Sequence, residues 1–495
     1  MQGNQKTLES FDEKHRTESE GYRAEAISID AAQSMEEVTY DGLIEKVVDD
    51  DNIDTALRRV VGNRGAPGVD GMTVHELESW LKTNREELKQ RIRSDGYIPT
   101  PVRRKEIPKP NGGIRKLGIP TARDRLVQQM VYQVLEPIYD PTFSESSYGF
   151  RPGRSAQDAV MKVGDYYDQG YIWAVGLDLE KFFDTLNQRF LMNILRERIG
   201  DKVLIRLIKR FLRAGVVLPN GLTEATLEGS PQGGPLSPLL SNIYLDKFDK
   251  ELESRGLRFC RYADDSLILV RTERAATRVC ESATRFLEED LHLKVNREKT
   301  EIGSPKYLKF LGFRLYSAKD GAGFAPHPTA IAKFRKNVRQ ITKRHRSVSL
   351  ESMLKELGQY MRGWIGYFGL ATGRNLIQSL DEWVRRRVRQ FIIKQWKNGR
   401  TRYRETYKLC PPERIIPQTG TPDISWLMLC GQMARTKSYW KASKLRGANI
   451  GMSNKWLARQ GMFFLSDDWE KVKERCFNRR VPNGMHGGVR GRTAK

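Results

Sequence analysis

Apolar and polar positions in the middle of the chain predict a β-hairpin with acidic residues at its tip. Two short, mainly apolar runs, residues 259–262 and 266–269, flank the adjacent pair Asp264 and Asp265. Apolar runs of this length around a polar turn are typical of paired strands. Upstream, the apolar run 171–177 predicts another strand, which ends at Asp178.

Helical spacing of apolar residues predicts helices over residues 124–138 and 190–213. A Gly- and Pro-rich segment at 64–71 predicts a loop between helices. A second such loop, 229–238, leads into a helix whose apolar face is formed by Leu236, Leu239, Leu240 and Ile243. Its glycines would let the backbone approach a base or a sugar closely, although a tight turn before a helix is the alternative.

Residues 98–120 predict a strand, a turn and a second strand, because Asn111-Gly112 is a strong hairpin signal. The hairpin is rich in basic side chains that could fold over phosphate groups: Arg103, Arg104, Lys105, Lys109, Arg115 and Lys116. The alternative for such a run is a solvated, charged surface.

Beyond residue 330 the pattern changes to basic amphipathic helices. The segment 333–346 is intensely basic and includes Arg335, Lys336 and Arg339. A helix over 380–394 is expected to place apolar residues on one face. Its other face would carry Arg385, Arg386, Arg387, Arg389 and Lys394. Basic helices interleaved with aromatic residues are suited to gripping a nucleic-acid duplex through its phosphates.

Length and charge widen this picture. A chain of 495 residues is too long for one ordinary domain, so three or four are expected. The net charge of +24 predicts a polyanionic partner such as nucleic acid; the alternative is a basic surface without a partner. Residues 1–46 instead carry a net charge of −6, and the polar segment 1–37 reads as a flexible acidic extension.

Neither a membrane nor an oxidising compartment is expected. The chain has no apolar run of membrane-spanning length, and its first residues lack the apolar core of a signal peptide. Its five cysteines are scattered without metal-site spacing, so reduced thiols, and no disulfide framework or structural zinc, are expected. These features predict a cytoplasmic protein.

The candidate chemistry rests on Asp178, Asp264 and Asp265. One acid at a strand end and two at a hairpin tip would form the hard oxygen site that Mg²⁺ prefers. Two metal ions about 3.5–4 Å apart can clamp the attacking and leaving oxygens of phosphoryl transfer. A lone Asp-Asp pair is more often a solvated turn, but the apolar flanks and the second acidic strand end favour a cation site.

Taken in order, the motifs resemble the reverse transcriptases, or maturases, encoded by group II introns. The resemblance covers roughly residues 43–469 and includes the Tyr-Ala-Asp-Asp form usual in that family. The matching stretches are residues 64–71, 107–115, 148–152, 178–184, 230–238, 262–265, 293–300 and 310–313. It implies an α+β, right-hand polymerase with fingers, a palm containing an antiparallel sheet, an α-helical thumb and a basic C-terminal region. The expected divisions are 1–37 for the extension, 38–165 for the N-terminal region and fingers, 166–325 for the palm with interleaved fingers elements, 326–408 for the thumb and 409–495 for the C-terminal region.

The resemblance also implies roles for single residues. Asp178, Asp264 and Asp265 would bind two Mg²⁺ ions, while Lys109 and Arg115 would contact the incoming triphosphate. Phe183 matches the family's sugar gate, whose ring would exclude a ribose 2′-hydroxyl, with ordinary core packing as the alternative. Gln232 would line the nucleotide pocket, and Lys299 is a weaker candidate for protonating the leaving pyrophosphate.

The implied activity is an RNA-directed DNA polymerase that copies intron RNA and assists its splicing and mobility. Its partners would be group II intron RNA, an RNA template, a DNA primer, a DNA target site and dNTPs. The tail lacks paired Cys or His at metal spacing, so no endonuclease module is expected. Two alternatives stay open: a domesticated reverse transcriptase used in defence or repair, and a non-catalytic RNA-binding splicing factor.

Overall fold

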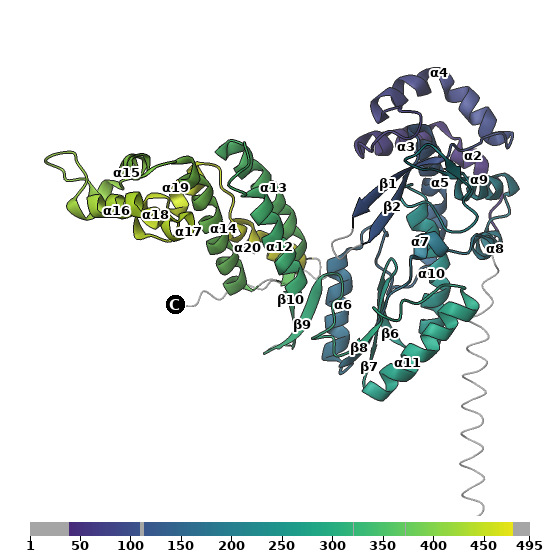
Figure 1. The fold of residues 1–495 in the computed structure, drawn as a ribbon. Coiled ribbons are helices and arrows are strands. Elements are labelled where there is room, and N and C mark those ends of the chain that lie inside the picture. The colour runs from purple at the N-terminus through teal and green to yellow at the C-terminus, as the bar shows by residue number, and fades with distance from the viewer. Residues whose placement is uncertain (1–38, 109–112, 320, 372, 479–495) are drawn as a thin grey trace, which may run out of the picture. The chain divides into compact units, whose positions relative to one another are not determined.

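The computed structural model describes residues 39–108, 113–319, 321–371 and 373–478 (Figure 1). The chain forms two compact units. The first takes residues up to 143, 181–247 and 291–293, and the second takes 144–180, 248–290 and 294 onward. Within the described residues, no helix combines the length and apolar character needed to cross a membrane. The division into fingers, palm and thumb at the residues given above stays a prediction.

The first unit is mainly helical. Its helices are α2 (Leu43–Val47), α3 (Asp50–Gly62), α4 (Val74–Arg93), α5 (Ala122–Tyr139), η1 (Asp140–Thr142), α7 (Phe182–Thr185), α8 (Gln188–Arg198), α9 (Lys202–Leu212) and the start of α10 (Ser237–Ser254). The expected loop at 64–71 does lie between helices, α3 and α4. The expected helix over 124–138 is also confirmed, as α5.

A small sheet in this unit contains the predicted basic hairpin. Strands β1 (Val102–Pro108) and β2 (Ile114–Ile119) pair antiparallel, with Arg103 opposite Ile119 and Pro108 opposite Ile114. Strand β4 (Val216–Val217) adds to β1 in parallel, and β5 (Thr223–Glu224) follows it. The two predicted strands are therefore confirmed, while residues 109–112 of the predicted turn, including Lys109, lie outside the described residues.

The helical prediction for 190–213 is confirmed, but the segment forms two helices, α8 and α9, with a break between them. Asp201 ends the continuity by capping α9, accepting hydrogen bonds from the amides of Val203 and Leu204, each 3.0 Å away. The same carboxylate accepts the Ile44 amide at 2.8 Å. A buried carboxylate that satisfies three amide donors outweighs the apolar spacing, which runs through the break.

The second unit is built around a four-stranded antiparallel sheet in the order β6-β7-β3-β8. Strands β6, β7 and β8 are labelled in Figure 1. The strands are β3 (Trp173–Leu177), β6 (Arg258–Tyr262), β7 (Asp265–Val270) and β8 (Glu301–Gly303). Residues 266–270 of β7 are all buried, so both faces of this sheet are covered. Helix α6 (Ala156–Asp168) packs on β6 and β7, while α11 (Glu273–Arg285) packs along β3 and β8 and continues into the π-helix η2 (Phe286–Asp290).

The rest of the second unit is a β-hairpin followed by helices. The hairpin pairs β9 (Phe313–Ala318) with β10 (Gly321–Pro326). The helices are α12 (Pro328–Ile341), α13 (Leu350–Phe368), η3 (Gly369–Ala371), α14 (Arg374–Gln395), α15 (Gly399–Lys408), η4 (Pro412–Arg414), α16 (Ile424–Arg435), α17 (Tyr439–Ala442), α18 (Arg446–Gly451), α19 (Asn454–Arg459) and α20 (Leu465–Asn478). Buried apolar residues from α12, α13, α14 and the later helices form one core cluster.

Candidate active site

The acidic pair lies at the tip of the predicted hairpin. Strands β6 and β7 pair up to Tyr262 and Asp265, so Ala263 and Asp264 form a two-residue turn. Ala263 has a φ of +58°, a value that suits such a turn but is uncommon for a residue other than glycine. The hairpin prediction is confirmed, and the turn holds a backbone conformation that its surroundings must stabilise.

The third carboxylate comes from the neighbouring strand. Leu177 is opposite Ser266 in the β3–β7 pairing, so the next residues, Asp178 and Asp265, meet at one end of the sheet. The carbonyl oxygen of Asp178 accepts a hydrogen bond from the Asn296 amide at 2.8 Å. The Nζ atom of Lys299 forms an ion pair with Asp178 Oδ2 at 3.2 Å. The 293–300 motif thus places a cation beside Asp178.

The environment of Asp265 includes the charges of the other two carboxylates. Desolvation by the surrounding protein, followed by the negative charges of Asp264 and Asp178, raises the pKa of Asp265 to about 6, although part of its side chain reaches solvent. Among the described residues, no three acidic, His or Cys side chains already converge into a metal-binding cluster. The carboxylate oxygens of Asp178, Asp264 and Asp265 are of the type and charge that a hard divalent cation prefers. To bind such a cation together, the three side chains would have to turn toward it.

Arg261, on β6 close to the turn, supports the hairpin tip from the interior of the protein. Its side chain is fully buried and pairs with Asp249 on α10, with Nε–Oδ1 and Nη2–Oδ2 distances of 2.7 and 2.5 Å. It also donates to Ser147 Oγ at 2.8 Å and to the Ala263 carbonyl at 3.0 Å. One guanidinium therefore connects a helix, the 144–152 segment and the turn that carries Asp264.

Gly149 holds the other side of the turn. A Cβ atom at Gly149 would lie 2.2 Å from the Ala263 amide nitrogen and 2.8 Å from the Tyr262 carbonyl carbon. Its neighbour Tyr148 donates its amide to the Arg261 carbonyl at 2.8 Å. Since the backbone at Gly149 does not have a positive φ, glycine is required there for space rather than for conformation.

In the first unit, backbone hydrogen bonds bring the expected nucleotide-binding segments together. The Ser230 amide donates to the Phe183 carbonyl at 2.7 Å, and the Gly118 amide on β2 donates to the Gln232 carbonyl at 2.8 Å. Phe183 stays half-buried beside Phe182, which is only 2% exposed. Arg115, on the same strand as Gly118, is exposed.

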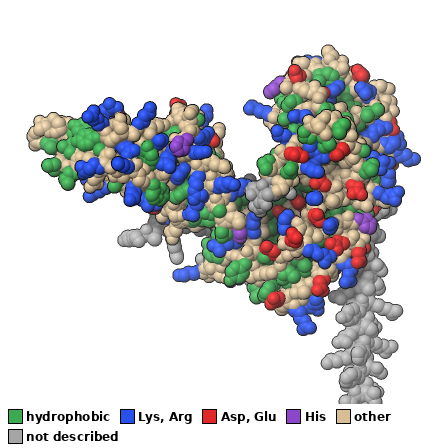
Figure 2. Space-filling view, in the orientation of Figure 1, with side chains coloured by type: hydrophobic (Ala, Val, Ile, Leu, Met, Phe, Trp, Pro, Cys, Tyr) green, Lys and Arg blue, Asp and Glu red, His purple; other side chains and the backbone are tan. Residues whose placement is uncertain are grey.

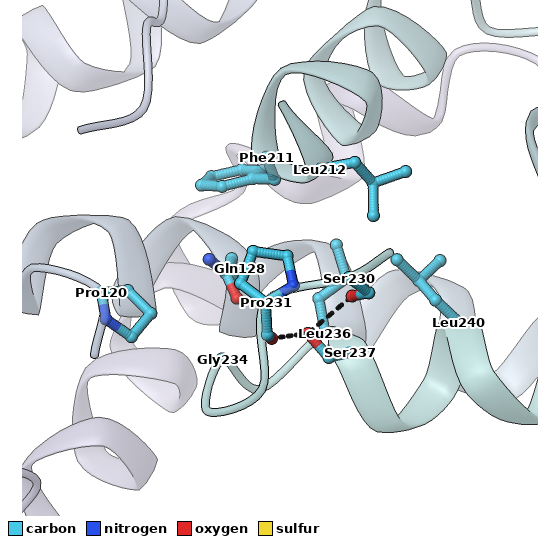
Figure 3. A pocket seen from close by; sticks show the side chains of 10 residues that line it. All are labelled: Pro120, Gln128, Phe211, Leu212, Ser230, Pro231, Gly234, Leu236, Ser237 and Leu240. Atoms are coloured by element: carbon cyan, nitrogen blue, oxygen red, sulfur yellow. Dashed lines mark hydrogen bonds between the residues drawn. The ribbon is translucent and has the colours of Figure 1, made fainter. Parts of the chain in front are cut away.

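The loop that carries Gln232 is packed tightly onto this unit (Figure 3). Ser237 Oγ donates to the Pro231 carbonyl at 2.8 Å, and Ser230 Oγ donates to Ser237 Oγ at 3.1 Å. The small cavity under the loop, lined by Phe211, Gln128 and neighbouring residues, has a volume of about 10 Å³. That volume is close to the minimum for a single water molecule, so the cavity is a small packing void and is too small to hold a nucleotide.

The expected nucleic-acid-binding residues do not form one uniform surface. Arg335, Lys336 and Arg339 on α12 are exposed, whereas Arg385, Arg386 and Arg387 on α14 are half-buried. Arg387 donates to Thr342 Oγ1 at 3.1 Å. Arg389 is only 6% exposed, so its expected place on an open basic face is wrong. In the face shown in Figure 2, the charged side chains over the C-terminal helices are mostly Lys and Arg, with few Asp and Glu.

Sequence reasoning missed Arg261 and Asp249 as parts of the site. Arg261 adjoins the Tyr-Ala-Asp-Asp motif, and a charged residue inside an apolar strand run is a usable signal, because buried charges are normally paired. No local pattern marks Asp249 as the partner, since the pair depends on how α10 packs.

Comparison with known proteins adds to this geometry. Residues 107–315 match the model for "Reverse transcriptase (RNA-dependent DNA polymerase)", and residues 331–409 match the "Group II intron, maturase-specific domain". Protein YkfC of Escherichia coli is 35% identical over 309 residues, which cover 54% of this chain and 81% of that protein.

Two further relatives have names that refer to introns. The group II intron-encoded protein LtrA of Lactococcus lactis is 34% identical, covering 49% of this chain and 40% of LtrA. A putative COX1/OXI3 intron 2 protein of Saccharomyces cerevisiae is 42% identical, covering 34% of this chain and 20% of that protein. The chain thus spans less than half the length of these two relatives.

The matched regions include each element of the acidic site. Asp178, Asp264 and Asp265, with Arg261 and Gly149, all fall within the reverse transcriptase match, and α13 and α14 fall within the maturase match. The chain therefore belongs to the reverse transcriptases encoded by group II introns, RNA-directed DNA polymerases with a right-hand α+β fold whose partners are intron RNA and other nucleic acids.

Proposed function

We propose that the chain copies intron RNA into DNA by two-metal nucleotidyl transfer and binds its intron RNA to assist splicing and retromobility. The observation that carries this proposal is the meeting of Asp178 with the Asp264–Asp265 turn at one end of the antiparallel sheet. Reverse transcriptases as a family depend on divalent metal ions. The raised pKa of Asp265 supports a cation site, because a bound cation would favour the charged carboxylate that desolvation and the two neighbouring negative charges disfavour.

Asp178, Asp264 and Asp265 would hold two Mg²⁺ ions. When bound, such ions lower the pKa of a primer 3′-hydroxyl and neutralise the leaving pyrophosphate. Lys299 keeps a positive charge beside Asp178, and its side chain is 65% exposed. It is therefore free to turn toward a triphosphate and is the candidate for donating a proton to the pyrophosphate.

The nucleotide contacts belong to the first unit. Arg115, on the basic hairpin, would place fixed positive charge on the incoming triphosphate, and we assign the same role to Lys109. The Phe183 ring would exclude a ribose 2′-hydroxyl and so select dNTPs. Gln232, held on its stiff loop, would line the pocket for the base or sugar.

The other partners follow from the family and the basic helices. We expect an RNA template, a DNA primer and a DNA target site as the bound polymers, held in part by Arg335, Lys336 and Arg339 on α12. With these partners, the cytoplasm or nucleoid of a bacterial cell is the expected place of action.

Primer extension tests the proposal directly. Wild-type protein with an RNA template, a DNA primer, dNTPs and Mg²⁺ should make DNA, whereas Asp264→Asn should make none while still binding RNA. Asp165→Asn is the matched control, because it makes the same charge change at an exposed site on α6. RNA binding without DNA synthesis by the wild type would instead favour the non-catalytic splicing factor.

A further inference from the structure

An open cavity lined by charged and polar residues lies in the second unit, between α14 and the segment 444–454. Its volume is about 490 Å³, within the roughly 300–1,000 Å³ typical of ligand sites. The lining residues are Glu382, Arg385, Arg386, Arg389, Lys444, Asn449 and Asn454. Four of these seven side chains are basic and one is acidic, so the cavity has an excess of positive charge.

Arg389 forms the buried floor of this cavity. Its guanidinium donates to the Met452 carbonyl from Nε at 3.1 Å and from Nη2 at 2.8 Å, and it also bonds Asn449 Oδ1 through Nη1. These contacts fix the side chain to Asn449 within α18 and to Met452, the residue that follows this helix. Arg389 is thus a structural support with a permanent charge below the cavity, and not a mobile surface arginine.

The two arginines above it are partly constrained. Arg385 donates from Nη1 to Asn454 Oδ1 at 2.5 Å. Arg386 reaches Glu382, one helical turn earlier, at 3.4 Å, with both side chains more than a third exposed. A pair of that length in contact with solvent compensates the charge weakly. A guanidinium has five N–H donors, so both arginines keep donors for a ligand.

The opposite wall contributes a lysine. Lys444 is exposed, and its Nζ atom lies 4.4 Å from the centre of the Trp440 ring. The Asn449 side chain donates to the Lys444 carbonyl at 3.2 Å, which joins this wall to the residue that holds Arg389. The basic groups therefore converge from two separate segments that are cross-linked by asparagines.

Like charges crowd one another in this arrangement. Burial, followed by the charges of Arg385 and Arg386, lowers the pKa of Arg389 to about 10. The single acid in the lining, Glu382, leaves this repulsion largely uncompensated. An anion seated among the three arginines would relieve it.

We propose that this cavity is a phosphate-binding site that takes consecutive phosphodiester groups of a bound polynucleotide. No apolar or aromatic residue is among the lining residues, so a nucleobase would find no stacking surface, whereas guanidinium groups match phosphate oxygens in charge and geometry. We favour a polynucleotide over a small polyphosphate because the proposal rests on the proposed function, in which a nucleic-acid polymer is the substrate. Binding of a small polyphosphate instead of a polynucleotide is one outcome that the experiment distinguishes.

The experiment measures binding of an RNA duplex as a function of KCl concentration for wild type, Arg385→Gln/Arg386→Gln, and the exposed-site variant Lys444→Gln. Each lost phosphate contact should reduce the slope of log affinity against log salt by about 0.9. We expect a reduction of about 1–2 for the double variant and about 1 for Lys444→Gln. The control is Arg274→Gln/Arg278→Gln, which removes two exposed charges from α11 and should reduce the slope much less.

Equal slopes for the cavity variants and the α11 control would overturn the proposal. Since Lys444 is exposed, its variant still decides the question if the double variant misfolds. Calorimetry with tripolyphosphate separates the two sources: saturable heat lost in the cavity variants, with unaltered RNA slopes, would overturn the polynucleotide assignment. Primer extension by the wild type is measured in parallel. If the wild type makes no DNA, the proposed function is contradicted, whereas the salt-dependence slopes test the cavity independently of that result.

Discussion

The guanidinium of Arg261 donates a hydrogen bond to the carbonyl oxygen of Ala263, 3.0 Å away, and so links the turn that carries Asp264 to a buried ion pair with Asp249. The tip of the hairpin is therefore supported by charge-assisted contacts from inside the protein. Removing one member of a buried pair typically costs about 3–5 kcal/mol of stability, which makes conservative substitutions the informative ones.

Arg261→Lys should preserve the charge but lose the simultaneous contacts to Asp249, Ser147 and the turn, because an ammonium group cannot span them. We expect the kcat of primer extension to fall about 100-fold, the size of effect that follows a displacement of about 1 Å at a reacting centre. The KM for dNTPs should change little, since Arg261 touches no expected nucleotide contact. Steady-state kinetics provide the measurement.

Arg258→Lys is the control for this prediction, because Arg258 lies on the same strand and is exposed. It should extend primers like the wild type. Equal kcat values for Arg261→Lys and wild type would remove Arg261 as a positioning residue.

Gly149→Ala should displace the turn, because the added methyl group would meet the Ala263 amide at 2.2 Å. Extension should be lost to a similar degree while RNA binding by the basic helices persists. Gly363→Ala is the matched control, since Gly363 lies within α13 with no atom near its Cβ position, and alanine there should stabilise the helix by about 0.5–1 kcal/mol. Melting curves and extension assays of both variants provide the comparison. An active Gly149→Ala enzyme would show that the turn tolerates the displacement.

The raised pKa of Asp265 predicts a pH dependence of metal binding. Its carboxyl is protonated below a pKa of about 6, and a protonated carboxyl does not bind a cation, so Mg²⁺ affinity should fall by about tenfold per pH unit below that value. Asp264→Asn removes one of the charges that raise this pKa, so the pKa should move toward the ordinary 3.8. Carbon NMR of aspartate carboxyl groups in metal-free protein would follow both changes, with Asp165→Asn as the charge-matched control. If the pKa of Asp265 is the same in Asp264→Asn as in the wild type, the electrostatic effect of Asp264 on Asp265 is contradicted.

Phe183→Ala should admit ribonucleotides, because the half-buried ring at 183 is the proposed barrier to the 2′-hydroxyl. The ratio of rNTP to dNTP incorporation should rise by about 10–200-fold, the range for steric discrimination by a pocket. Phe182→Ala gives the contrast, since Phe182 is 2% exposed and its loss should lower stability by about 3–5 kcal/mol without changing sugar selectivity. Competitive incorporation assays distinguish the two, and unaltered selectivity in Phe183→Ala would leave that ring with a packing role.

The antiparallel hairpin and the acidic strand end could be predicted because both are local patterns. Short, mainly apolar runs on either side of a two-residue turn specify β6 and β7, and an apolar run that stops at an acid specifies the end of β3. The register that sets Asp178 beside Asp265 is a property of strand pairing, and it follows from the sheet rather than from either segment alone.

Other features could not be predicted in this way. The break between α8 and α9 depends on Asp201 accepting the amide of Ile44, which is distant in the sequence. The burial of Arg389 depends on its hydrogen bonds to the Met452 carbonyl and to Asn449. The sequence predicts this arginine on an exposed basic face, but it lies buried at the base of a cavity. The Gly200-Asp201 pair, a helix stop followed by a capping residue, is a local sign of the break between α8 and α9, but it does not reveal the contact with Ile44.

The ion pair between Lys299 and Asp178 has a consequence for electroneutrality at the sheet end. A tethered ammonium group already balances one of the three acids, so the site need not carry its full negative charge when free cations are scarce. Chelator-treated protein should then keep its hairpin folded and recover activity on simple addition of Mg²⁺. In such a site Lys299 acts as a built-in counterion. When Mg²⁺ binds, the metal ion replaces the ammonium group beside the acids, and the fold around the site stays the same.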